Sequence, residues 1–244
     1  IAEVTKGMLN SVGLQNPGAE YFLENELPWL RQFDTKLIAN LCGSTIEEYV
    51  EVAEILGNKL DMFELNISCP NVKEGGMAFG TDAKMIEEIT SKVKAVSKVP
   101  LIVKLSPNVT DIAEMAKAAE AGGADAISLI NTLLGMKIDI NTRRPVLNNN
   151  MGGMSGPAVM PVAVRMVYQV RQAVKLPIIG MGGITTGEDA VEFLLAGADA
   201  VSVGTAGIVD PYAWIKVRNG INDYLDKNGY ESVNDIVGKL EMNN

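Results

Sequence analysis

Two segments of this chain repeat one another, and this repeat constrains the fold more than any other feature. Gly123–Leu129 and Gly197–Val203 agree in residue type at every position, and each begins where a helical stretch gives way to a β-branched run. A glycine followed by a strand is the usual end of a helix in alternating βα units. The repeat therefore favours repeated βα units around a parallel sheet, as in a (β/α)₈ barrel.

Six strands are predicted from the β-branched runs. They are Lys36–Cys42, Met62–Ser68, Leu101–Ser106, Ala126–Thr132, Pro177–Gly182 and Ala200–Gly204. A closed barrel needs eight strands, and no clear strand precedes Lys36. Either the sheet is open, or the first two strands of a barrel are missing from this chain. We prefer the second and expect one α/β domain over residues 1–244, an incomplete TIM barrel.

Helices are predicted between the strands from apolar residues at helical spacing. Thr110 or Asp111 is expected to open one of them, and Thr185 or Thr186 another, because these residue types cap helix N-termini. The tail from Pro211 onward is expected to be helical, with a break at Asn228-Gly229.

Composition excludes several classes of function. A net charge of −9 disfavours binding to nucleic acids or anionic membranes, and no apolar run approaches the roughly 18 residues of a membrane span. The chain has no histidine, so histidine bases and histidine metal ligands are ruled out. Cys42 and Cys69 are too few for a disulfide framework, a Cys₄ zinc site or an iron–sulfur cluster. We expect a protein of the reducing cytoplasm.

Polar residues gather at the end of the predicted strand Met62–Ser68. Alternate residues of a barrel strand face the axis, so Glu64 and Asn66 are expected to point inward, and Cys69 follows directly. Such strand ends carry the active sites of barrels. The Gly-rich loop after Cys69 is suited to closing over a substrate. Cys42, at another strand end, is expected to be buried packing.

Lys104 and the glycine-rich turns indicate a phosphorylated cofactor. Lys104 lies inside an apolar strand and needs an anionic or electron-rich partner. Gly182-Gly183 and Gly204-Thr205 follow the last two strands and precede helix starts, where backbone N–H groups bind phosphate. Gly152–Pro157 is predicted to be a flexible turn. With a thiol base and no Rossmann fingerprint, this pattern favours flavin chemistry.

The motifs Met8–Gly18 and Asn66–Asn71 resemble those of dihydroorotate dehydrogenases. Asn131–Asp139, with Arg143–Pro145 and Gly152–Pro157, is similar to the NAD-linked class 1B catalytic subunit. The resemblance implies an FMN-containing (β/α)₈ barrel that oxidises dihydroorotate to orotate in pyrimidine synthesis.

The resemblance also implies a role for each matching residue. Cys69 would remove the C5 proton as hydride leaves C6 for the flavin, and Lys104 would stabilise negative charge on the reduced ring. The substrate would be held by Asn10, Ser11, Val12, Gly13, Leu14, Asn66, Asn131 and Thr132. FMN would be held by Asn40, Asn66, Lys104, Ile130, Gly156, Gly182, Gly183, Gly204 and Thr205.

A partner is implied as well. Class 1B enzymes pair with an electron-transfer subunit carrying FAD and a [2Fe–2S] cluster, which passes electrons to NAD⁺, in a heterotetramer around a dimer of the catalytic chain. The two first strands of the family, which bring FMN contacts and a substrate-binding lysine, have no counterpart here.

Four other interpretations stay open from the sequence. They are a fumarate-linked class 1A enzyme, the flavin domain of a dihydropyrimidine dehydrogenase, a phosphate-binding barrel lyase or isomerase without flavin, and a non-catalytic fragment that only binds partners.

Overall fold

A six-stranded parallel sheet forms the centre of the molecule. The computed structural model describes residues 1–67 and 79–243. In that part of the chain the strands lie in the order β12–β11–β6–β5–β4–β3. Their bounds are Ile38–Leu41 for β3, Met62–Asn66 for β4, Leu101–Lys104 for β5, Ala126–Leu129 for β6, Ile178–Met181 for β11 and Ala200–Ser202 for β12. All six predicted strands are confirmed, and each ends earlier than predicted.

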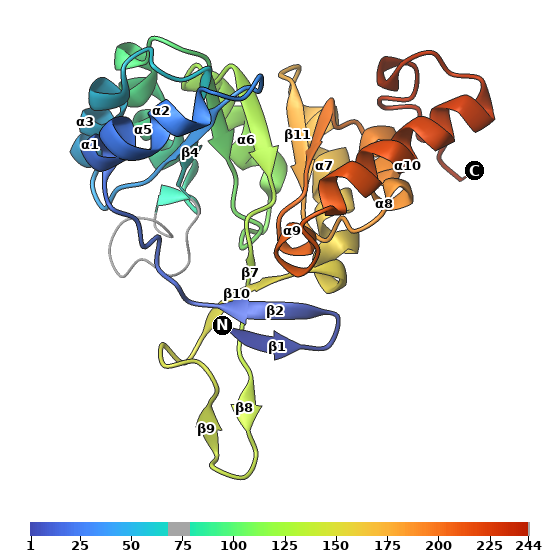
Figure 1. Ribbon diagram of the computed structural model, residues 1–244, viewed down its shortest axis with the longest axis horizontal. Helices are drawn as coiled ribbons and strands as arrows, with labels where there is room; N and C mark the ends of the chain where they lie inside the picture. Colours follow the sequence, from blue (N-terminus) through green and yellow to red (C-terminus); the bar gives the residue numbers. More distant parts are fainter. Residues whose placement is uncertain (68–78, 244) are drawn as a thin grey trace.

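Helices cover the outer face of this sheet (Figure 1). The longer ones are α3 Ile46–Leu56, α5 Ala83–Val96, α6 Ile112–Ala121, α7 Met160–Ala173, α8 Gly187–Ala196 and α10 Ala213–Asn228. Phe63, Leu65 and Ile67 are fully buried against them. In the described residues β3 and β12 are the two edges of the sheet, so it is a curled half-barrel rather than a closed barrel.

The chain also contains several short helices and helical turns. They are α1 Ala19–Tyr21, the π-helical turn η1 Phe22–Glu26 and α2 Leu27–Leu30 before β3, the 3₁₀ turns η2 Pro157–Val159 and η3 Val233–Asp235, and α9 Thr205–Val209 after β12.

The predicted helix boundaries are confirmed at their capping residues. The Asp111 side chain accepts from the N–H groups of Ala113 and Glu114 and opens α6. Thr186 caps α8 by accepting from Asp189 N–H. Gly229, with φ +71°, ends α10 at the predicted break. Local hydrogen bonding sets these ends, which is why they can be predicted from sequence.

A second, antiparallel sheet lies across the carboxyl ends of the parallel strands. Its order is β1 Ala2–Val4, β2 Gly7–Asn10, β10 Gly152–Ser155 and β7 Leu133–Gly135. The hairpin of β8 Ile138–Asp139 and β9 Arg144–Pro145 projects from it (Figure 1). The expectation of no strand before Lys36 was wrong. These strands are too short to show alternation, and β2 is paired with the distant β10, Asn10 facing Gly153.

The prediction of a flexible turn at Gly152–Pro157 was also wrong for its first four residues. These residues form β10, an interior strand of the antiparallel sheet. Gly153 pairs with Asn10 on one side and Leu134 on the other. A Cβ at Gly153 would lie 2.1 Å from Thr132 Oγ1. Glycine therefore serves close approach of the backbone at this position.

No helix in the described residues is long and apolar enough to cross a bilayer.

Candidate active site

A cavity of about 420 Å³ lies between the carboxyl ends of β5, β6, β11 and β12 and the antiparallel sheet. Its size falls in the range of small-molecule and cofactor sites, roughly 300–1,000 Å³. The carboxyl ends of parallel strands are where barrels place their active sites. We call this cavity the strand-end cavity.

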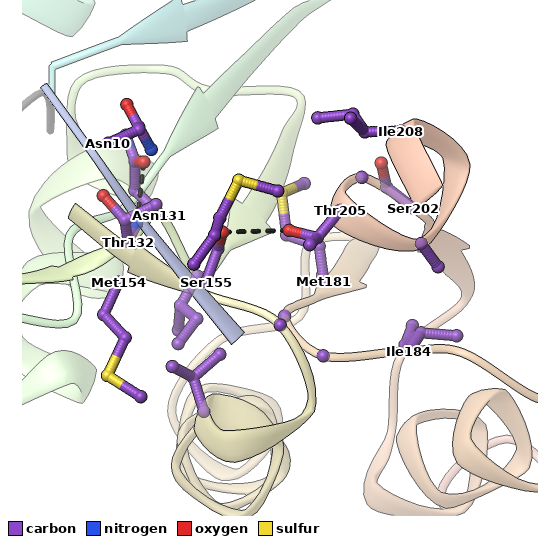
Figure 2. A pocket seen from close by; sticks show the side chains of 18 of the residues that line it. Asn10, Asn131, Thr132, Met154, Ser155, Met181, Ile184, Ser202, Thr205 and Ile208 are labelled. Carbon is purple, nitrogen blue, oxygen red and sulfur yellow. Dashed lines mark hydrogen bonds between the residues drawn. The ribbon is translucent and has the colours of Figure 1, made fainter. Parts of the chain in front are cut away.

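Polar groups line two opposite sides of the strand-end cavity, and Ser155 and Met181 lie between them (Figure 2). Figure 2 shows Asn10 and Asn131 on one side, and Thr205 and Ser202 on the other. Thr205 Oγ1 donates to Ser155 Oγ over 2.9 Å. The apolar lining includes Met8, Ile130, Met154, Val159, Met181 and Ile184. A largely apolar lining with polar groups on two sides suits a flat aromatic ring with polar ends.

Two glycine loops differ in the space around them. Gly183 has φ +89°, and a Cβ there would lie 2.8 Å from Met160 Cβ and 2.9 Å from Gly156 O. A Cβ at Gly204 would meet no protein atom within 4 Å. The chain itself requires glycine at Gly183, whereas at Gly204 the space beside the backbone is open.

The N-terminus of α8 differs from expectation. Asp189 Oδ2 accepts from the N–H groups of Thr185 and Thr186 and from Thr185 Oγ1, at 2.6–2.8 Å. Burial works against the charged form, but these hydrogen bonds outweigh it and lower the pKa of Asp189. A carboxylate of the chain thus accepts the N–H groups at the N-terminus of α8, so these two groups are already used and would not hold a phosphate at the predicted Gly182-Gly183 loop.

Lys104 has an anionic partner on the inward face of the sheet. Its Nζ lies 3.5 Å from Glu64 Oε2, and both side chains are mostly buried, with 19% and 13% of their surface exposed. Asn40 Nδ2 donates to Glu64 Oε2 over 2.5 Å, and Ser128 Oγ donates to Glu64 Oε1 over 2.6 Å. Side chains from β3, β4, β5 and β6 therefore meet at one carboxylate.

Three asparagines form a hydrogen-bonded series beside this carboxylate. Asn131 Nδ2 donates to Asn66 Oδ1 over 3.2 Å, and Asn66 Nδ2 donates to Asn40 Oδ1 over 3.0 Å. Asn131 Oδ1 accepts from the N–H of Thr132 over 2.7 Å. The buried hydroxyl of Tyr49 on α3 donates to the carbonyl of Asn66 over 2.8 Å, which holds the end of β4.

Most of the sequence-predicted residues meet in the strand-end cavity. Those that line it are Asn10, Val12, Lys104, Ile130, Asn131, Thr132, Gly156, Gly182, Gly183, Gly204 and Thr205. Asn66 is joined to them through Asn131. Ser11 and Gly13 lie outside the lining, and the carbonyl of Ser11 accepts from Asn149 Nδ2.

The other predicted residues lie elsewhere. Leu14 and Asn40 line a second cavity, of about 730 Å³, along β3. Cys42 lies there too and is half-buried, so the expectation that it is buried packing was wrong. Cys69 and most of the Gly-rich loop after it lie outside the described residues.

Sequence reasoning missed several groups of the site. Met154, Ser155, Met181 and Ser202 all line the cavity. Ser202 lies in the repeated segment and on the inward side of β12, a signal that could have found it. Glu64 was expected to face inward, but no role was assigned to it.

Comparison with known proteins identifies the family. The family described as Dihydroorotate dehydrogenase matches residues 1–225. This chain belongs to the dihydroorotate dehydrogenase family. It is therefore classed with oxidoreductases, and the family is FMN-dependent in general.

Individual relatives agree with this assignment. Dihydroorotate dehydrogenase B (NAD(+)), catalytic subunit, of Alkaliphilus oremlandii is 61% identical over 241 residues, covering 98% of this chain and 80% of the relative. The protein of the same name from Bacteroides fragilis is 57% identical over 244 residues, covering 99% of this chain and 80% of the relative. Both relatives are named as one subunit of a larger enzyme.

A solved structure supports the fold. The crystal structure of DHODH from Eimeria tenella in complex with ferulenol superposes with a TM-score of 0.79 at 21% identity, covering 96% of this chain and 71% of the other.

Proposed function

We propose that this chain oxidises dihydroorotate to orotate with a bound FMN, and that the electrons pass onward to NAD⁺ through a partner subunit. The observation that carries this proposal is the strand-end cavity, whose lining combines glycine loops, apolar side chains and amides.

The lining of this cavity fits FMN. Gly182, Gly183, Gly204 and Thr205 would hold the phosphate, because backbone N–H groups at such loops bind anions. The open space beside Gly204 admits a phosphate group without displacing protein atoms. Ile130, Gly156 and Met181 would flank the ring. When bound, FMN supplies the hydride acceptor that this chain's own side chains lack.

The remaining residues would bind and deprotonate the substrate. Asn66, Asn131 and Thr132 would hold the pyrimidine and its carboxylate, with further contacts from the segment Asn10–Leu14. Cys69 would take the proton from C5, since this chain has no histidine to act as the base. Asn40 and Lys104 would contact the cofactor, and Lys104, which pairs with Glu64, would place a positive charge beside it.

The partner subunit follows from the relatives, which are named catalytic subunits of NAD(+) enzymes. It would carry FAD and a [2Fe–2S] cluster and form a heterotetramer around a dimer of this chain. The reducing cytoplasm is the compartment that we propose, because a chain with only two cysteines has no disulfide framework.

The visible absorption spectrum of the purified protein tests the proposal. Flavin absorbance is expected, with anaerobic bleaching on addition of dihydroorotate. Gly183→Leu should abolish the absorbance, because its side chain would collide with Met160 and Gly156. Glu51→Leu, a change on the exposed side of α3, is the control that should retain FMN.

Two results would contradict the proposal. One is a folded, colourless protein that binds inorganic phosphate but no flavin, which points to the lyase or isomerase class. The other is full FMN occupancy in Gly183→Leu.

A further inference from the structure

We infer that Glu64 is a positioning residue: it fixes the direction of the hydrogen bonds through Asn40, Asn66 and Asn131, and thereby which amide atoms face the substrate. We call these three side chains the amide relay. The inference rests on the proposed function, because it concerns the residues that would bind the pyrimidine.

In all its contacts the Glu64 carboxylate acts as a hydrogen-bond acceptor or as an anion. Its two oxygens accept from Asn40 Nδ2 and Ser128 Oγ, and Lys104 Nζ lies 3.5 Å away. An ionised carboxylate accepts hydrogen bonds and cannot donate them. The amide of Asn40 must therefore turn its NH₂ group toward Glu64.

This orientation passes along the amide relay. With its NH₂ on Glu64, Asn40 presents Oδ1, which accepts from Asn66 Nδ2. Asn66 in turn presents Oδ1, which accepts from Asn131 Nδ2. The far end agrees, because Asn131 Oδ1 accepts from the N–H of Thr132, a backbone donor that cannot reverse. A fixed acceptor at one end and a fixed donor at the other give the relay one direction.

The direction matters for the ligand. Rotating an asparagine amide by about 180° puts its NH₂ group where its oxygen was, so a donor replaces an acceptor at nearly the same place. A site that hydrogen-bonds a ligand discriminates strongly against mismatched polar groups. Asn131 lines the strand-end cavity, and its amide is held from two sides, by the N–H of Thr132 and, through Asn66 and Asn40, by Glu64. Loss of Glu64 frees Asn40 and Asn66 to turn and removes the second of these restraints, which changes the hydrogen-bonding pattern that the substrate meets.

Two substitutions at Glu64 separate acceptance from charge. Glu64→Met removes both acceptor oxygens at similar size, whereas Glu64→Gln removes the charge but keeps one oxygen able to accept from Asn40. The dissociation constant for orotate is measured on the FMN-loaded chain from the shift of the flavin spectrum. Glu64→Met should weaken orotate binding about tenfold, and Glu64→Gln should restore it to within about threefold of the parent value.

The alternatives are distinguishable. Parent-like orotate binding by Glu64→Met overturns the inference, and so does a Glu64→Gln variant as weak as Glu64→Met, which would make charge the cause. Glu51→Met, the same change on the exposed side of α3, should leave orotate affinity unchanged. A parent protein that binds neither FMN nor orotate refutes the proposed function instead.

A second variant covers the case in which Glu64→Met does not fold or hold FMN. Asn40→Ala cuts the amide relay at its first member but leaves the contacts of Glu64 with Ser128 and Lys104. It should weaken orotate binding by a similar factor, and unchanged binding would overturn the inference.

Discussion

Both ends of the parallel sheet carry carboxylates paired with basic side chains, but the arrangement differs between the ends. At the amino end, Asp61, Asp125 and Asp199 each directly precede a strand. Each accepts the N–H at the start of the neighbouring strand, from Leu37 over 3.0 Å, Leu101 over 2.7 Å and Ile178 over 2.7 Å. Each also pairs with a basic side chain, from Arg31, Lys94 and Arg171 respectively. One arrangement is thus repeated three times.

The carboxyl end shows no such repeat. Glu64, Lys104, Asn40 and Asn131 come from different strand positions and converge on a single network beside the strand-end cavity. A repeated carboxylate is expected where the same unpaired backbone N–H occurs at the start of several strands. Different residues that converge on one place are expected where they bind one ligand. We therefore expect changes at the carboxyl end to alter rate and ligand affinity, and changes at the amino end to alter stability.

The largest expected effect is at Cys69, which follows β4 in the sequence. Cys69→Ala should slow the bleaching of the flavin by dihydroorotate by about two to four orders of magnitude, as for loss of a general base, while FMN stays bound. Stopped-flow absorbance measures the rate. Cys42→Ala is the matched control, because Cys42 lies on the other cavity, and its rate should equal the parent rate. A parent-like rate and pH profile in Cys69→Ala would mean that another group is the base.

Two lysines, each in an ion pair, sharpen the comparison. Lys104 pairs with Glu64 at the carboxyl end, and Lys94 pairs with Asp125 at the amino end. If Lys104 contacts the flavin as proposed, Lys104→Ala should slow the same reaction about a hundredfold, through loss of a charge beside the reacting ring. Lys94→Ala should leave the rate unchanged, because an exposed ion pair contributes little. Equal effects of the two substitutions on the rate would break the proposed division between the ends.

How far the sequence predicts this molecule depends on the range of the interactions. The six parallel strands and the caps Asp111 and Thr186 are local features, and all were predictable. The antiparallel sheet was missed because β2 is completed by β10 from far along the chain.

The candidate site divides in the same way. Glycine-rich turns and polar residues at strand ends can be recognised in the sequence, and most of the predicted ones line one cavity. The role of Glu64 is not visible in the sequence, because its partners Asn40, Lys104 and Ser128 come from three other strands.

At the amino end the expected effect is on stability. Asp199→Ala leaves the N–H of Ile178 without its acceptor and Arg171 without its carboxylate. The free energy of unfolding should fall by about 1–3 kcal/mol, the cost of an unsatisfied buried donor. Urea denaturation measures this loss, and the affinity for FMN should match the parent value in the folded variant. A weakened FMN affinity without loss of stability would contradict the expectation that changes at the amino end affect stability rather than ligand binding.

The smallest expected effect is the pH dependence contributed by Asp61. The hydrogen bond from Leu37 N–H, together with Lys36 and Arg31, outweighs partial burial and lowers the pKa of Asp61 from 3.8 to about 2. A carboxyl whose pKa is lower in the folded state stabilises the protein above the unfolded pKa, and that contribution is lost as the pH falls through the folded value. Compared with Asp61→Asn, the parent should therefore be more stable at pH 7, and this advantage should shrink between about pH 4 and pH 2.

Urea denaturation of both proteins across this range measures the difference. If the difference between parent and Asp61→Asn stayed constant down to pH 2, the hydrogen bond to Leu37 would not depend on the charge of Asp61, and the repeated carboxylates would act as neutral acceptors.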